Sequence, residues 1–176
     1  SLAVLRVSWN QLESLPEELG RLHQLQHLLA EGNQLAALPA SACQLANLQQ
    51  LVLSANPLRE LPDQLGECAA LRVVALRATE VERIPYSLCA AHKLTVLKLE
   101  GNPQLVSPPP EVVEGGLDAV ITHLMQLRIA GERSRRHSSH SAHMEEHRAR
   151  QAEQAAADQQ KTAAELGQKL EQLKSD

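Results

Sequence analysis

A spacing of 23 residues organises most of this 176-residue chain. Asn10, Asn33 and Asn56 are 23 positions apart, and two further steps of that length reach Thr79 and Asn102. Aliphatic residues, mostly leucine, keep the same register at several other positions of each unit. A fixed period of about 20–50 residues is typical of chains that stack similar units, each contacting only its neighbours. The spacing therefore favours a stack of five units over an ordinary globular core.

Each unit reads LxxLxLxxN, or a close variant, followed by xLxxLPxxL. The alternation of inward leucines with other residues predicts a short strand in each unit. The LP step cannot continue a strand ladder, because proline has no N–H, so we expect extended chain and short helical turns there. The asparagine amide can bond backbone groups of neighbouring units that would otherwise be buried unpaired. We call the side-chain hydrogen bonds made at this position the rung of each unit. Thr79 lacks the reach of an amide, so the fourth unit is predicted to have the weakest rung.

These anchors identify residues 1–105 as resembling the leucine-rich-repeat family. The resemblance implies an α/β fold: a right-handed solenoid of five 23-residue repeats with parallel strands on its concave face. No cap precedes Leu2, Leu5 and Val7, so we expect further sequence upstream.

The end of the repeats resembles the intracellular Ras-group branch of that family, particularly its plant-type members. Gln104 is an added residue relative to their pattern. The resemblance implies a cytoplasmic, non-catalytic interaction module related to signalling scaffolds. A similar pattern occurs beside ubiquitin-ligase or calponin-homology domains. The matching residues are Asn102, Pro103, Leu105, Pro108, Pro109, Glu111, Val112, Val113, Gly116, Ala119 and Val120.

Three segments follow the repeats. Residues 106–130 are predicted to form a C-terminal cap helix, with Leu117, Val120, Ile121, Leu124 and Leu127 on one face. Residues 131–148 are a linker or helix entry rich in histidine, arginine and serine, and 149–176 are predicted to form a projecting, coiled-coil-like helix. Its heptad seam consists of Ala149, Ala152, Ala156, Gln159, Ala163, Leu166, Leu170 and Leu173.

Composition excludes several function classes. The net charge of −4 and the pI near 6.1 leave no basic footprint for nucleic acid, and no apolar run is long enough to suggest a membrane span. Cys43, Cys68 and Cys89 are odd in number and form no CxxC pair, which favours a reducing compartment and a role as small apolar filler.

Two short motifs are candidates for chemistry. The residues from His143 to His147 match H-x-x-E-H, but a zinc enzyme needs a third ligand and a large supporting domain, so we predict no metal site. Arg135 and Arg136 precede Ser138 with a spacing that basophilic kinases prefer, which leaves phosphorylation of that serine open. We predict no catalytic activity and no cofactor.

The strand face is the predicted binding surface, because residues that alternate with the inward leucines point outward there. An apolar centre with charged rims is typical of protein interfaces. Trp9 is a candidate anchor for a partner, and packing against an upstream unit is the alternative. The predicted partner-binding residues are Arg6, Trp9, His27, Leu29, Glu31, Gln50, Val52, Ser54, Val73, Ala75, Arg77, Val96, Lys98 and Glu100.

The favoured function is a non-enzymatic scaffold that binds a protein partner on this face, while residues 149–176 dock a partner helix. A small GTPase or another signalling or assembly component fits the family resemblance as the partner. One alternative is a structural subunit of a large assembly, held by the cap and the tail. Another is the recognition part of a larger enzyme, such as a ubiquitin ligase.

Overall fold

The computed structural model describes residues 2–132. The chain divides into two units, Ser1–Ile129 and Ala130–Asp176. Predictions for residues 133–176 lie outside the described residues; they concern the projecting helix, Ser138, the H-x-x-E-H motif and most of the linker. Among residues 2–132, no helix is long and apolar enough to span a membrane.

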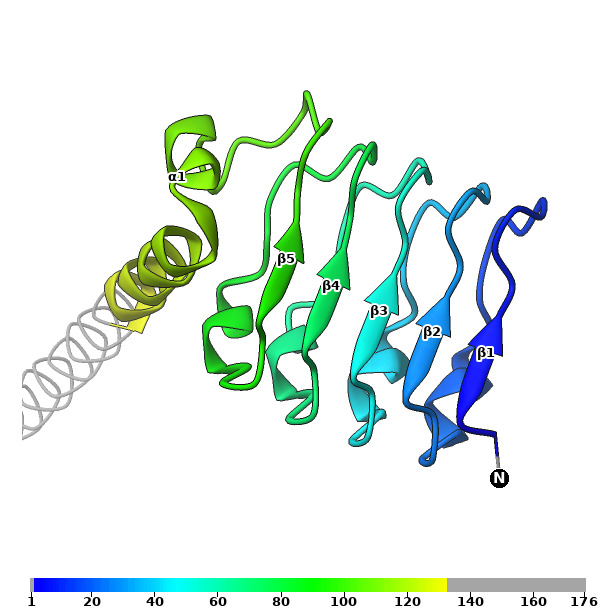
Figure 1. The fold of residues 1–176 in the computed structure, drawn as a ribbon. Helices are drawn as coiled ribbons and strands as arrows, with labels where there is room; N and C mark the ends of the chain where they lie inside the picture. The colour runs from blue at the N-terminus through cyan, green and yellow to red at the C-terminus, as the bar shows by residue number, and fades with distance from the viewer. Residues whose placement is uncertain (1, 133–176) are drawn as a thin grey trace, which may run out of the picture. The chain divides into compact units, whose positions relative to one another are not determined.

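Five short strands form one parallel sheet, in the order in which they occur along the chain (Figure 1). The register steps by 23 residues from strand to strand, so that Leu5, Leu28, Leu51, Val74 and Leu97 are paired in succession. The predicted stack of parallel strands is therefore confirmed. The strands are β1 (Val4–Arg6), β2 (His27–Leu29), β3 (Gln50–Val52), β4 (Val73–Ala75) and β5 (Val96–Lys98).

Short 3-10 helices return the chain from each strand to the next. Pro16, Pro39 and Pro85 immediately precede three of them in an extended conformation, with ψ of 151°, 144° and 132°. Proline suits this position because the first N–H of a helix has no intrahelical partner to lose. The helices are η1 (Glu17–Arg21), η2 (Ala40–Gln44), η3 (Leu65–Glu67) and η4 (Tyr86–Ala90).

The core lies between the strands and these helices and consists of aliphatic residues. Leu25, Leu48 and Leu71 occupy equivalent positions of successive units, and each is completely buried. The two aromatic residues contribute little, since Trp9 is 73% exposed and Tyr86 is 39% exposed. The layer between strand and helix is thus thin enough for leucine to fill without aromatic rings.

Asparagine side chains connect the units at the ends of the strands. Nδ2 of Asn33 donates to the carbonyl oxygens of Val7 in the preceding unit (2.9 Å) and Ala30 in its own (3.0 Å). Its Oδ1 accepts the N–H of Leu12 at 3.1 Å. Asn56 repeats this arrangement one unit further along the chain. Each side chain thereby pairs buried backbone groups from two units, which would be destabilising if left unpaired.

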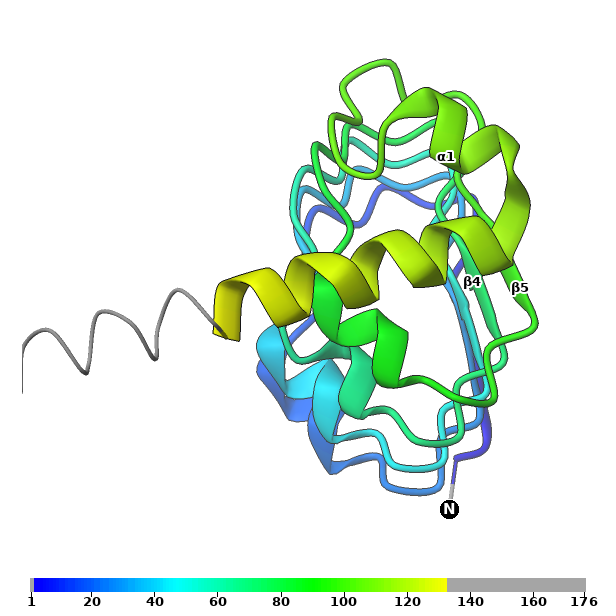
Figure 2. The ribbon, with the colours of Figure 1, turned by 90° about the vertical axis from the view of Figure 1, so that its left-hand side faces the viewer.

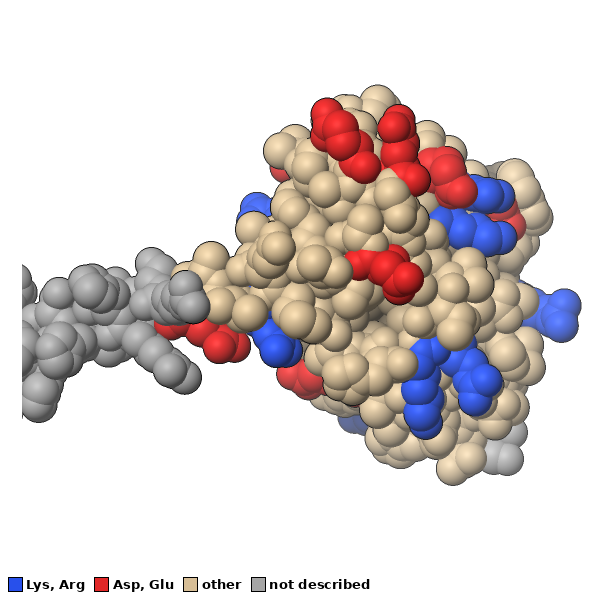
Figure 3. Space-filling model, turned by 60° about the vertical axis from the view of Figure 1, so that its left-hand side comes forward, with Lys and Arg blue, Asp and Glu red and all other residues tan. Residues whose placement is uncertain are grey.

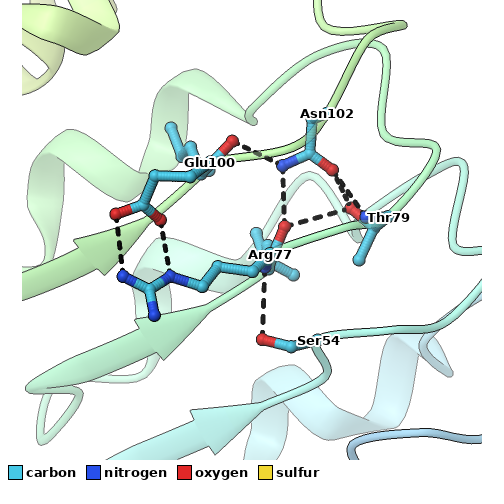
Figure 4. Close-up of polar contacts among 7 residues, drawn as sticks. Ser54, Arg77, Thr79, Glu100 and Asn102 are labelled. Atoms are coloured by element: carbon cyan, nitrogen blue, oxygen red, sulfur yellow. Dashed lines mark hydrogen bonds and ion pairs between the residues drawn. The ribbon is translucent and has the colours of Figure 1, made fainter.

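Thr79 changes this rung, as the sequence predicted (Figure 4). Its hydroxyl lies 3.3 Å from the carbonyl oxygen of Leu76 and 2.6 Å from Oδ1 of Asn102. Asn102 Oδ1 also accepts the N–H of Thr79, at 2.8 Å. Among the described residues, no hydrogen bond joins the Thr79 side chain to the preceding unit. The fourth rung is therefore bonded only within its own unit and to the next.

Two helices follow the last strand. α1 (Pro110–Glu114) is short. Gly116, with φ of +82°, redirects the chain at the start of a second helix over residues 116–132. Val120 and Leu124 of that helix belong to the same buried cluster as the repeat leucines, and Figure 2 shows the helix crossing the last unit. Leu127 does not face inward as the sequence predicted. It is 41% exposed, whereas the next residue, Arg128, is half-buried.

Replacing Thr79 by asparagine should strengthen the fourth rung. The amide would reach the carbonyl of Leu53 and accept the N–H of Leu58, as Asn56 does for the preceding pair of units. We expect the free energy of unfolding, measured by urea titration, to rise by about 1 kcal/mol, and to fall by a similar amount for Thr79→Val. Thr122→Asn, on the exposed helix surface, is the control. An unchanged transition in Thr79→Asn would contradict this account.

Candidate functional site

The outward face of the sheet carries two rows of side chains. One row runs from Val4 through His27 and Gln50 to Val73 and Val96, which are paired in register. The second row is Arg6, Leu29, Val52, Ala75 and Lys98, in the same order of strands. We call these two rows the strand face. The 23-residue period places its members side by side, although each comes from a different unit.

Four apolar side chains of the strand face are half-buried. Leu29 and Val52 are adjacent on β2 and β3, and Val73 and Val96 are adjacent on β4 and β5. The exposed Arg6 and the half-buried Lys98 stand at the two ends of the row that contains Leu29 and Val52. The outward face thus carries two apolar pairs, one on β2 and β3 and one on β4 and β5, with a basic residue at each end of one row.

Polar side chains of the strand face are paired across strands. Nδ1 of His27 and Oε1 of Gln50 are hydrogen-bonded at 3.1 Å. Beyond the strand ends, Nε and Nη2 of Arg77 donate to the two carboxylate oxygens of Glu100 at 2.8 and 3.0 Å (Figure 4). The hydrogen bonds from Arg77 lower the pKa of Glu100 to about 2. Glu100 is therefore anionic throughout the physiological pH range.

Two of the predicted contact residues are almost completely buried, although Ala75 lies in the outward row of the sheet. Ser54 is 6% exposed, and its Oγ accepts the N–H of Arg77 at 3.2 Å. Ala75 is also 6% exposed, because it is small and lies between Val52 and Lys98 in register. Neither residue offers appreciable surface to a partner.

Trp9 lies at a position where the backbone is left-handed in every unit. Its φ is 58°, and Ala55 and Ala78 have φ of 54° and 50°. Gly32 and Gly101 occupy the same position, where glycine adopts a positive φ without steric cost. The Trp9 ring lies against Gly32, where an added Cβ would overlap it. Trp9 therefore packs partly on the following unit and still exposes most of its surface.

A groove of ≈ 260 Å³ continues from the end of the strand face. Of its lining residues, only Glu100 was predicted from the sequence to bind a partner, because no periodicity encodes how the loop after β5 brings α1 beside the strand end. Figure 3 shows several acidic side chains gathered toward the end that carries α1. The groove is lined by Leu99, Glu100, Gly101, Asn102, Leu105, Pro110, Val113 and Glu114.

Cys43 and Cys68 are not arranged as reactive groups. Burial, and then the charge of Glu67, raises the pKa of Cys43 to about 11. Burial, with smaller contributions from Cys43 and Glu67, raises the pKa of Cys68 to about 12. Both thiols are protonated at neutral pH, whereas the nucleophilic form is the thiolate. Within residues 2–132 no group of three or more acidic, histidine or cysteine side chains is placed to hold a metal ion.

Comparison with known proteins now identifies the architecture. One similar structure is a leucine-rich-repeat protein of Leptospira interrogans, which is 30% identical with a TM-score of 0.60. The match covers 65% of this chain and 29% of the Leptospira chain. The chain has the leucine-rich-repeat fold. No family model and no curated protein matches the sequence.

A second leucine-rich-repeat structure is the ectodomain of the receptor kinase GASSHO1/SCHENGEN3 from Arabidopsis thaliana, solved in complex with CASPARIAN STRIP INTEGRITY FACTOR 2. It is 28% identical with a TM-score of 0.51, and the match covers 57% of this chain and 16% of the receptor chain. This leucine-rich-repeat chain spans less than a third of the length of either structure. The finer resemblance to the Ras-group branch stays a prediction.

The Arg77–Glu100 pair predicts a distinctive titration. A lowered pKa means that the pair's contribution to stability is present above the ordinary carboxyl pKa and is lost as pH falls toward 2. This contribution should be small because both side chains are exposed. In Arg77→Gln, NMR of the carboxyl carbon should show the pKa of Glu100 returning toward about 4.3. Arg59→Gln, which breaks the separate pair with Glu80, should leave it unchanged, and an equal shift in both variants would contradict the assignment.

Proposed function

We propose that this chain is a non-enzymatic module that binds a protein partner on its strand face. The observation that carries the proposal is the half-buried apolar centre of Leu29, Val52, Val73 and Val96 between charged rims. A solvated sheet surface does not require two pairs of adjacent apolar residues, one on β2 and β3 and one on β4 and β5. Burying such a centre while the charged rim remains hydrated is the usual construction of a protein interface.

The comparisons support a protein ligand in general. The plant receptor ectodomain, which also consists of leucine-rich repeats, was solved in complex with CASPARIAN STRIP INTEGRITY FACTOR 2. The groove beside the strand face extends the proposed surface, and its apolar lining with the carboxylate of Glu114 suits a partner residue that has an aliphatic stem and a basic head.

The proposed partner is a signalling or assembly component, with a small GTPase among the candidates. This choice, the scaffold role and the cytoplasmic location rest on the resemblance of residues 97–128 to the Ras-group proteins. The docking of residues 149–176 to a partner helix rests on their heptad seam.

Charges placed in the apolar centre should abolish binding. Leu29→Glu with Val52→Glu would bury two unpaired carboxylates in the complex while leaving the inward leucines untouched. For a partner isolated with the wild-type chain and then purified, we expect affinity measured by calorimetry to fall by at least about 100-fold. Circular dichroism checks that the variant keeps its fold.

The matched control is Ala36→Glu with Ala46→Glu, which adds the same charges at exposed positions outside the strands. It should bind as the wild type does. Full retention of binding in Leu29→Glu/Val52→Glu would exclude the strand face as the site. Loss of binding on deleting residues 149–176, with the strand-face variant unaffected, would favour a subunit held by its tail.

A further inference from the structure

The last strand of the sheet has one unpaired edge. Within residues 2–132, β5 pairs with β4 on one side and with no strand on the other (Figure 1). The carbonyl oxygen of Lys98 accepts the N–H of Leu76, so the backbone groups of Lys98 point toward β4. Backbone groups alternate in direction along a strand, so those of Leu99 and Gly101 point away from β4. An edge of this kind can pair with a further strand.

Two backbone N–H groups at this edge differ from their equivalents in the earlier units. The equivalent groups one unit earlier, those of Leu76 and Ala78, donate to carbonyl oxygens of the next unit at 2.9 and 3.0 Å. In the part of the chain that the structure describes, no acceptor is bonded to the N–H of Leu99 or of Gly101. Leu99 is only 4% exposed, and an unpaired donor in a buried position is destabilising. Both donors are therefore available to carbonyl oxygens of another chain.

The groove of ≈ 260 Å³ between the end of β5 and α1 lies at these two donors. Leu99 and Gly101 are among its lining residues. Leu105, Pro110 and Val113 supply an apolar surface from the following loop and from α1. An extended chain paired with β5 would lie about 4.8 Å from it and would direct alternate side chains to the same side. The groove thus offers both a strand edge and a place for an aliphatic side chain.

The charge of the groove favours a basic residue near the aliphatic one. Glu100 and Glu114 contribute carboxylates to its lining, which contains no lysine, arginine or histidine. Glu100 is already paired with Arg77, whereas Glu114 has no ion pair among residues 2–132. A lysine or arginine two positions from the aliphatic residue would have its side chain on the same face of an extended chain. Its charge would then be attracted to Glu114.

We propose that this groove binds an extended segment of a partner protein, which adds a further strand beside β5. Carbonyl oxygens of the segment accept the N–H groups of Leu99 and Gly101. An aliphatic side chain of the segment contacts Val113, and a basic side chain two positions away lies near Glu114. In this mode of recognition the main-chain hydrogen bonds supply affinity and the side-chain pocket supplies specificity. The proposal goes beyond the strand-face site, because it concerns the edge of the sheet and not its outward face.

The probe is the peptide acetyl-Thr-Val-Thr-Lys-Thr-methylamide, titrated into the 15N-labelled full chain at low salt and followed by NMR. The amide signals of Leu99 and Gly101 should move most, with a dissociation constant on the order of 1 mM. Two analogues test for strand pairing: one is methylated on the backbone nitrogens of valine and lysine, and the other on those of the three threonines. Because only alternate residues face β5, one analogue should bind at least about tenfold more weakly than the other.

Matched variants test the contribution of the groove. Val113→Ala and Glu114→Gln should each weaken peptide binding by at least about threefold, because one removes apolar contact and the other removes the attracting charge. Their controls are Val106→Ala and Glu111→Gln. Both control residues are exposed and lie outside the groove, so these changes should not alter the affinity.

The strand-face variant separates this proposal from the proposed function. Leu29→Glu with Val52→Glu should bind the peptide as the wild type does, so that either proposal can fail while the other stands. Equal binding of the two methylated analogues, equal effects of the groove variants and their controls, absence of saturable shifts, or shifts centred elsewhere would each overturn the proposal.

Discussion

The structure depends on buried asparagine amides that satisfy backbone groups from two successive units. Stacking short strands buries carbonyl and N–H groups just beyond the strand ends, where the ladder no longer pairs them. Asn33 and Asn56 bond these groups across the boundary between units, and in doing so they keep neighbouring strands in a register of 23 residues. That register in turn aligns the outward side chains, so the strand face is a consequence of the rungs.

Periodicity made the strands and the core predictable from the sequence. Leu28 and Leu51 are completely buried at the positions that the pattern assigned to the core. Exposure of individual outward residues was less predictable, because it depends on neighbours that the period does not specify. Ala75 is covered by the larger residues beside it, and the Ser54 hydroxyl accepts a backbone N–H of the next unit.

The outer helices show a different limit of sequence reasoning. The alternation of Gly20, Cys43, Gly66 and Cys89 is visible in the sequence, but its meaning depends on how closely one helix backbone approaches the next. Leucine spacing does not contain that information. The groove beside α1 was missed for a related reason, since the loop after β5 follows no repeat and brings Val113 and Glu114 to the strand end.

The two faces of one repeat are free to differ because the residues that hold the stack together lie between them. Changes at outward strand positions leave the asparagine rungs intact, because the rungs lie beyond the strand ends. The strand face could therefore acquire an apolar centre without loss of the stack. Binding to the strand face would depend mainly on buried apolar area, so it should respond only weakly to salt.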